Sequence, residues 1–406
     1  MKRNICAALA LSVLSIQILA GCQDNYTPKG TLTVTTNSTE AMLPPVTKID
    51  PTAAVNEIPL KQMDLELKEN HQIHAEVYAP DIQELPSYKL EPLQFDPQAV
   101  AAVLIPDDSS PFTVDYDEMR KSSFLTTEKG NVLRIGSSSI SLYRNQDQDD
   151  PAKFSRDDTI LGLLTEYAQS NPDHQNDSLA FMTMKEAIQR AENVFKELGL
   201  CWQPVLQTSI GLDHQQIMQY QKEQLPEYEG IELQKTPVLD NLTQEDDAYL
   251  LTFGFSCNAV PLYGFPQEPG LEIGSDSPIP VYMSAEMIIT PQGITWFNLT
   301  GGYKTVETGV RPLLSAEEAV AKYKQKWDST ILPMADENWE VCAIYLEYIT
   351  KWTDGSPYLT PYWCLVRDSM ITNQFTGETT WSREVGFSGN GTRFNAFTGE
   401  ELLYGG

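Results

Sequence analysis

The sequence has few of the residues that most enzyme active sites require. Only four histidines occur in 406 residues, and none stands in a His-Glu-x-x-His frame or beside a metal-binding cysteine pair. The Walker loop, the Gly-x-Ser-x-Gly nucleophile motif and the Gly-x-Gly-x-x-Gly dinucleotide motif are missing as well. We therefore predict a noncatalytic protein that holds no metal and no cofactor.

Basic residues are also scarce. Lys and Arg number 28 against 56 Asp and Glu, which gives a formal net charge of −28. Such a surface repels phosphate backbones, so nucleic acid is not expected as a partner, and charged partners are expected to be cationic. The alternative is that the acidity only keeps an exported protein soluble.

After Ile18 the chain has no apolar run long enough to cross a bilayer, for which about 20 residues are needed. The run from Ile5 to Ile18 follows a basic start and leads into Leu-Ala-Gly-Cys at positions 19–22. This order is typical of a lipoprotein signal, in which the thiol of Cys22 takes a diacylglyceryl group. The alternative is an ordinary cleaved signal peptide with an incidental cysteine. We predict lipid attachment at Cys22 and a lipid-anchored location on the extracytoplasmic face of the cell membrane.

Composition and periodicity divide the chain into five parts. Residues 1–21 are the predicted lipoprotein signal peptide, and 22–59, rich in Thr and Pro, form a flexible tether. A smaller α/β segment is predicted for 60–170. Two further units are predicted for 171–310 and 311–406, because a helical pattern followed by period-two strands occurs in each.

The two later units begin in the same way. Thr183–Glu186 and Ser315–Glu318 each match the capping box that starts a helix, and an amphipathic pattern follows both. Strand patterns and a closing hairpin come next in both units, with Thr290-Pro291-Gln292-Gly293 as the turn of the first hairpin. The predicted fold class is therefore α+β, with a helix packed on an antiparallel sheet in each unit.

The last unit carries a recognisable combination of motifs. Ser-x-Glu-Glu-Ala at 315–319 and Asn-Ala-x-Thr-Gly-Glu at 395–400 resemble the PepSY-like module of exported bacterial proteins. The unit before it matches loosely, with an insert from Asp213 to Asp247. The whole chain also resembles uncharacterised clostridial lipoproteins of the DUF6034 type. For PepSY-like modules, the resemblance implies a noncatalytic fold that binds proteins or peptides, inhibits peptidases or helps to regulate envelope signalling.

Four cysteines other than Cys22 lie in the two later units. They occupy related places, and one disulfide in each unit is one interpretation. The other is that they are free and serve as small apolar core residues. These cysteines are Cys201, Cys257, Cys342 and Cys364.

The last unit is rich in aromatic residues. Core and sheet-face packing explains most of them, but Trp352 stands beside the turn residues Asp354 and Gly355. We therefore predict that Trp352 and Tyr358 form a binding surface, if the protein has one.

These features favour a membrane-tethered protein that binds a protein or peptide in envelope regulation or maintenance. Two other functions remain open: binding of a solute or glycan by the aromatic loop, and hydrolysis by acidic residues. An exposed sheet edge or flat apolar patch would favour the first function, a deep aromatic cleft the second, and a buried carboxylate pair the third. The sequence does not indicate an oligomeric state.

Overall fold

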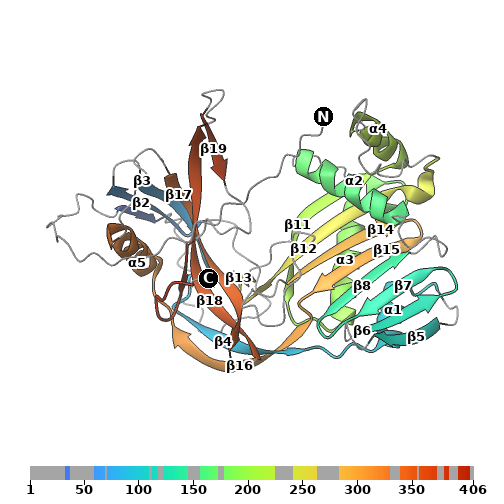
Figure 1. Ribbon diagram of the computed structural model, residues 1–406, viewed down its shortest axis with the longest axis horizontal. Coiled ribbons are helices and arrows are strands. Elements are labelled where there is room, and N and C mark those ends of the chain that lie inside the picture. The colour runs from blue at the N-terminus through green and yellow to red at the C-terminus, as the bar shows by residue number, and fades with distance from the viewer. Residues whose placement is uncertain are drawn as a thin grey trace, which may run out of the picture.

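Two large β-sheets form most of the protein, and five α-helices accompany them in the part of the chain that the structure describes (Figure 1). The structure is a computed structural model. It describes residues 33–36, 59–68, 71–108, 112–117, 122–144, 156–171, 178–224, 241–262, 283–329, 339–353, 356–372, 379–383 and 392–402.

The first sheet is mixed and has the strand order β1-β2-β3-β17-β18-β4-β16, with β19 and β20 also paired to β18. Its longest strands, β17 and β18, form a hairpin, and β3 pairs with β17 in parallel. The strands are β1 (Thr33–Thr36), β2 (Lys61–Lys68), β3 (His71–Tyr78), β4 (Glu84–Pro92), β16 (Tyr303–Pro312), β17 (Trp339–Thr353), β18 (Ser356–Thr372), β19 (Thr379–Arg383) and β20 (Thr392–Asn395).

The second sheet is antiparallel and has the order β11-β12-β14-β15-β8-β7-β6-β5, with β13 paired to β12. A separate two-stranded ladder joins β9 (Ser178–Leu179) to β10 (Met182–Thr183). The strands of the sheet are β5 (Phe112–Asp117), β6 (Ser122–Thr127), β7 (Asn131–Ile135), β8 (Ser139–Arg144), β11 (Gln203–Leu212), β12 (Ala248–Cys257), β13 (Val260–Pro261), β14 (Ser284–Thr290) and β15 (Gly293–Thr300).

Helices lie on both faces of the second sheet. Phe195 of α3 packs on Phe253, Phe255 and Phe297 on one face. On the opposite face, α2 and α4 share a separate apolar cluster with Leu250 and other strand residues. The helices are α1 (Pro97–Leu104), α2 (Arg156–Ser170), α3 (Met184–Glu197), α4 (His214–Gln224) and α5 (Ala316–Ser329), with a 3₁₀ turn, η1, at Gln244–Asp246. No described helix is both long and apolar enough to span a bilayer.

The predicted fold class is wrong. The structure is mainly β, and its large curled sheets are not two consecutive units with a helix packed on a sheet. Strands β2, β3 and β4 of the predicted first segment join the first sheet, whereas β5 to β8 join the second. The parallel pairing of His71 with Trp339 shows why sequence patterns missed this arrangement. Periodicity indicates that a strand exists, but it does not indicate which distant strand it pairs with.

Local predictions are confirmed where short-range chemistry decides them. The helix Pro97–Leu104 is present as α1, with Asp96 as its N-cap. Thr183 and Glu186 form the predicted capping box of α3, and Ser315 and Glu318 form the matching one before α5. Gly293 has φ +109° in the predicted hairpin turn, a conformation that favours glycine.

Strands β4 and β16 lead from the first sheet towards the second (Figure 1). At their common end the N–H of Leu93 donates to the carbonyl of Gly302. The N–H of Gly302 donates in turn to the carbonyl of Ser138 on the second sheet's side. A Cβ at Gly302 would lie 2.7 Å from the ring of Phe95. Glycine is therefore needed where the two chain segments pass so close together.

A buried polar network joins the two sheets. Asn258, in the turn between β12 and β13, has φ +55° and is 4% exposed. Its amide donates to the hydroxyls of Tyr88 on β4 at 2.8 Å and Tyr348 on β17 at 3.2 Å. Tyr348 donates onward to the carbonyl of Pro86 at 2.9 Å. Burial raises the pKa of both phenols, so both stay protonated near neutral pH.

We expect Asn258→Gly to lower the free energy of unfolding by about 1 to 3 kcal/mol, because it removes two buried hydrogen bonds while keeping a residue that tolerates positive φ. Urea unfolding followed by circular dichroism measures this loss. Asn241→Gly is the matched control, since Asn241 also has positive φ but is exposed. Equal unfolding midpoints for both variants would contradict a stabilising role for the network.

Candidate functional site

Strand β16 forms one edge of the first sheet and is largely exposed. From Lys304 onward its residues are exposed except Thr305, which is half-buried, and the side chains of Val306 and Val310 are 44% and 43% exposed. Its pairing with β4 is interrupted by a bulge at Thr308, whose hydroxyl donates to the carbonyl of Ser87 at 2.9 Å. On its other side no described strand pairs with β16.

The register of β4 and β16 shows which main-chain groups remain available. At one end Leu313 donates its N–H to the carbonyl of Gln83, and hydrogen-bonded pairs then recur at every second residue. Val310 and Pro86 lie between two such pairs and are themselves a non-hydrogen-bonded pair. This position suits Pro86 because proline has no N–H to donate. Val310 therefore directs its N–H and C=O away from β4, and the same alternation before the bulge gives Glu307 this orientation. These groups form the open edge of the sheet.

A groove of about 450 Å³ lies beside this edge. Its floor comes from three neighbouring strands, β16, β4 and β18. It is open to solvent, its surface is about equally polar and apolar, and it is lined by Ser87, Thr308, Gly309, Arg311, Tyr358 and Thr360.

One row of paired residues crosses four strands at the groove. Lys351 pairs with Tyr358, Tyr358 with Lys89, and Lys89 with Val306. Residues directly opposite each other in an antiparallel ladder place their side chains on one face. The row therefore puts an aromatic ring between two lysines.

Of the two binding residues predicted from the sequence, Tyr358 lies at the groove and Trp352 is not its cross-strand neighbour. Tyr358 lines the groove, but its cross-strand neighbour is Lys351, and Trp352 pairs instead with Pro357. The side chain of Trp352 lies outside the described residues, as does Cys22. Sequence reasoning missed Ser87 and Arg311, which line the groove with Tyr358, and Lys89, which pairs with it, because they come from distant chain segments and no local motif marks them.

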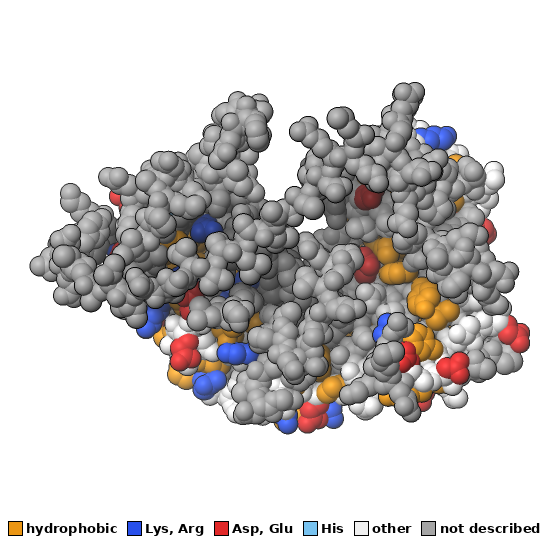
Figure 2. Space-filling view, viewed as in Figure 1, with side chains coloured by type: hydrophobic (Ala, Val, Ile, Leu, Met, Phe, Trp, Pro, Cys, Tyr) orange, Lys and Arg blue, Asp and Glu red, His pale blue; other side chains and the backbone are white. Residues whose placement is uncertain are grey.

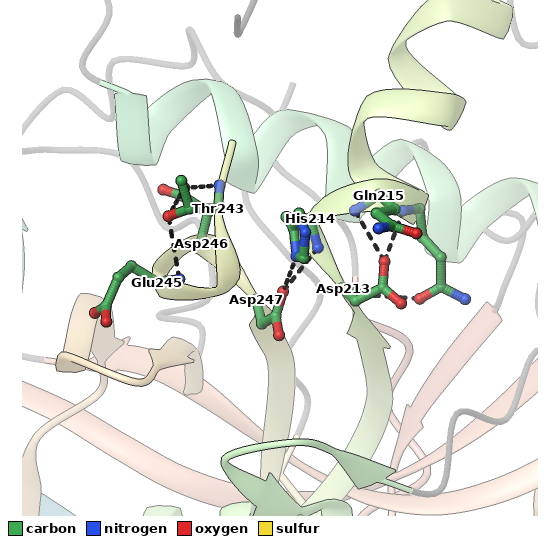
Figure 3. Close-up of polar contacts among 8 residues, drawn as sticks. Asp213, His214, Gln215, Thr243, Glu245, Asp246 and Asp247 are labelled. Atoms are coloured by element: carbon green, nitrogen blue, oxygen red, sulfur yellow. Dashed lines mark hydrogen bonds and ion pairs between the residues drawn. The ribbon is translucent and has the colours of Figure 1, made fainter. Parts of the chain in front are cut away.

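A second polar constellation lies at the start of α4 (Figure 3). The Oδ1 atom of Asp247 accepts from the backbone N–H of His214 at 2.8 Å and contacts the ring Nδ1 at 2.7 Å. Asp247 is 4% exposed, and its partner is half-buried. Asp213 caps the helix by accepting from the N–H groups of Gln215 and Gln216. This pair was not predicted, because 33 residues separate its members.

The geometry of His214 and Asp247 is that of a clamp. One carboxylate oxygen accepts from the first turn of α4, where unpaired N–H groups favour negative charge. It thereby fixes the helix to the start of β12. Another buried carboxylate, Glu347, pairs with Arg393 Nε at 2.7 Å. In the described residues these two carboxylates each pair with a basic group, and no three His, Cys, Asp or Glu residues gather as metal ligands would.

No disulfide joins the four described cysteines of the two later units. Cys201 is exposed, Cys342 is half-buried, and Cys257 and Cys364 are buried. Burial raises the pKa of Cys257 to about 12 and that of Cys364 well above its usual value. Because the thiolate is the reactive form, these two buried cysteines are poor nucleophiles.

We expect Asp247→Ala to destabilise the protein by about 1 to 3 kcal/mol, since it leaves the N–H of His214 without an acceptor. Asp247→Asn should lose less, because its amide oxygen can still accept a hydrogen bond. Thermal unfolding measures the difference, and hydrogen exchange of α4 locates it. A clamp would be ruled out if the alanine variant kept the stability and helix protection of the parent protein.

Alkylation by iodoacetamide at neutral pH should modify Cys201 first and leave Cys257 and Cys364 unmodified until the protein unfolds. Peptide mass spectrometry over time measures the three rates, with the denatured protein as the fully labelled control. Modification of Cys257 in the folded protein as fast as Cys201 would contradict the burial of that strand.

No protein-family model matches the chain, and no curated protein matches it. Among solved structures, the chain is similar to an uncharacterised protein from Eubacterium rectale ATCC 33656, known from a crystal structure at 1.45 Å resolution. The TM-score is 0.51 at 15% identity, over 84% of this chain and 93% of that one. This likeness concerns the fold alone, and the resemblance to PepSY-like modules and DUF6034 lipoproteins stays a prediction.

Proposed function

We propose that this protein is a noncatalytic, membrane-tethered lipoprotein of the extracytoplasmic face that binds a protein or peptide partner in envelope regulation or maintenance. The observation that carries the proposal is the exposed edge of β16 beside a groove. The partner would add an extended segment to this edge. Its main chain would pair with the outward groups of Glu307 and Val310, and its side chains would enter the groove.

Two features of β16, a bulge and its charged residues, fit a selective docking edge. The bulge at Thr308 and the charged residues Lys304, Glu307 and Arg311 interrupt what would otherwise be a regular, apolar template. Such devices limit pairing between identical edges and therefore limit aggregation. They leave a short stretch around Val310 for a partner whose side chains suit the groove.

A second candidate function is the binding of a small solute or glycan. The groove volume of about 450 Å³ lies within the range typical of ligand sites, and Tyr358 would offer a ring on which a sugar could stack. In that case the ligand would contact groove side chains and would not need the main chain of β16.

The two candidates predict different effects of proline at the edge. Peptides of about ten residues, slightly longer than an ordinary strand, are selected by phage display on the full-length protein in detergent. Binding of the selected peptides is then measured to the parent protein, Val310→Pro and Val310→Ala. Proline removes the outward N–H, whereas alanine keeps it. We expect about tenfold weaker binding to the proline variant, in line with the loss of a main-chain pairing site, and little change with alanine.

Equal binding to all three proteins would place the peptide site elsewhere and contradict strand addition. Enrichment of no peptide, together with binding of a glycan array to the parent and Val310→Pro alike, would favour the second candidate. Circular dichroism spectra of the variants control for folding.

A further inference from the structure

We propose that the docking segment of the partner is an acidic peptide, whose carboxylates are recognised by Arg311 and Lys89 beside Tyr358. This inference rests on the proposed function and names the chemistry of its ligand. It reverses the expectation, drawn from net charge, that charged partners are cationic.

The two basic groups lie next to the open edge of a protein that has twice as many acidic as basic residues. Neighbouring Lys304 pairs with Glu91 at 3.0 Å. Lys89, on the strand next to β16, forms no ion pair within the described residues. Its charge is therefore available to a ligand.

Arg311 is held at the groove without a carboxylate partner among the described residues. Its guanidinium lies 4.1 Å from the centroid of the Phe397 ring, a cation–π contact that orients the side chain while leaving its N–H donors available. The guanidinium fork binds a carboxylate with two parallel hydrogen bonds where geometry permits.

The two cations lie near a strand added to β16. Arg311 is on β16 itself, and because neighbouring strands lie about 4.8 Å apart, Lys89 on β4 is two strand spacings, about 10 Å, from the added strand. In a strand added to β16, every second side chain would face the groove. Acidic residues at alternate positions would therefore bring their carboxylates towards Arg311 and Lys89.

Lys and Arg side chains are visible together with hydrophobic and acidic ones over the part of the molecule that holds β4 and β16 (Figure 2). A polyphosphate or an anionic polymer would also be attracted to such a surface. The open main-chain groups of Glu307 and Val310 favour a peptide, because a polypeptide backbone can pair with them and a phosphate chain cannot donate to their carbonyls.

The test uses three fluorescein-labelled peptides of identical length, with threonine and valine at fixed positions and Glu, Gln or Lys at alternate positions. Fluorescence anisotropy gives the Kd of each for the full-length protein in detergent, at low and high salt. We expect the Glu peptide to bind about tenfold tighter than the Gln peptide and the Lys peptide to bind weakest, with the preference reduced by salt.

Variants assign the preference to the groove. The double variant Lys89→Gln/Arg311→Gln should bind the Glu and Gln peptides with similar Kd, whereas Lys304→Gln, the matched control, should keep the preference because Lys304 already pairs with Glu91. Two versions of the Glu peptide, N-methylated at the odd or at the even main-chain nitrogens, separate the two sets of amides. Only the version methylated at the amides that face β16 should lose binding.

Binding of all three peptides with equal Kd would overturn the acidic ligand and leave strand addition intact. Failure of all three peptides to bind would count against strand addition itself. Inorganic polyphosphate that binds as tightly as the Glu peptide, and equally to Val310→Pro, would overturn the peptide class.

Discussion

Hydrogen bonds from the buried amide of Asn258 to two phenols fix where strand β4 lies. Tyr88 points from β4 into this junction, while its neighbours Ser87 and Lys89 lie on the opposite face, where Ser87 lines the groove and Lys89 pairs with Tyr358. Because side chains alternate along a strand, a slip of β4 by one residue would exchange the two faces. The same hydrogen bonds that join the two sheets therefore also set the register of the groove residues.

The edge strand depends on this arrangement in turn. β16 pairs with β4 alone among the described strands. Because Pro86 of β4 has no N–H to donate, it stands opposite Val310 at a position where the main-chain groups of β16 point outward. The bulge at Thr308 shifts the alternation between Glu307 and Val310, so the open edge consists of separated groups rather than a continuous ladder. A docking partner would have to match that interruption, which is a source of selectivity.

Structural elements that depend on residues close in sequence could be predicted. The pairing of strands that are far apart in sequence could not. The capping box at Thr183 and the hairpin turn at Gly293 follow from local hydrogen bonding and backbone freedom. The pairing of β3 with β17 depends on contacts between residues about 270 positions apart, which one sequence does not encode visibly. Both cases occur beside the groove. Tyr358 was predicted from its place near a turn, whereas Lys89 lies opposite Tyr358 only because β4 pairs with β18 in the sheet.

The open edge of β16 is the central claim, and residue-resolved hydrogen exchange of the free protein tests it most directly. The account predicts fast exchange at the amides of Glu307 and Val310 and slow exchange at those of Val306 and Arg311, which point towards β4. Adding an acidic extended peptide should slow exchange at Glu307 and Val310. Slow exchange at both of these amides in the free protein would contradict the account, because it would mean that the edge is already paired.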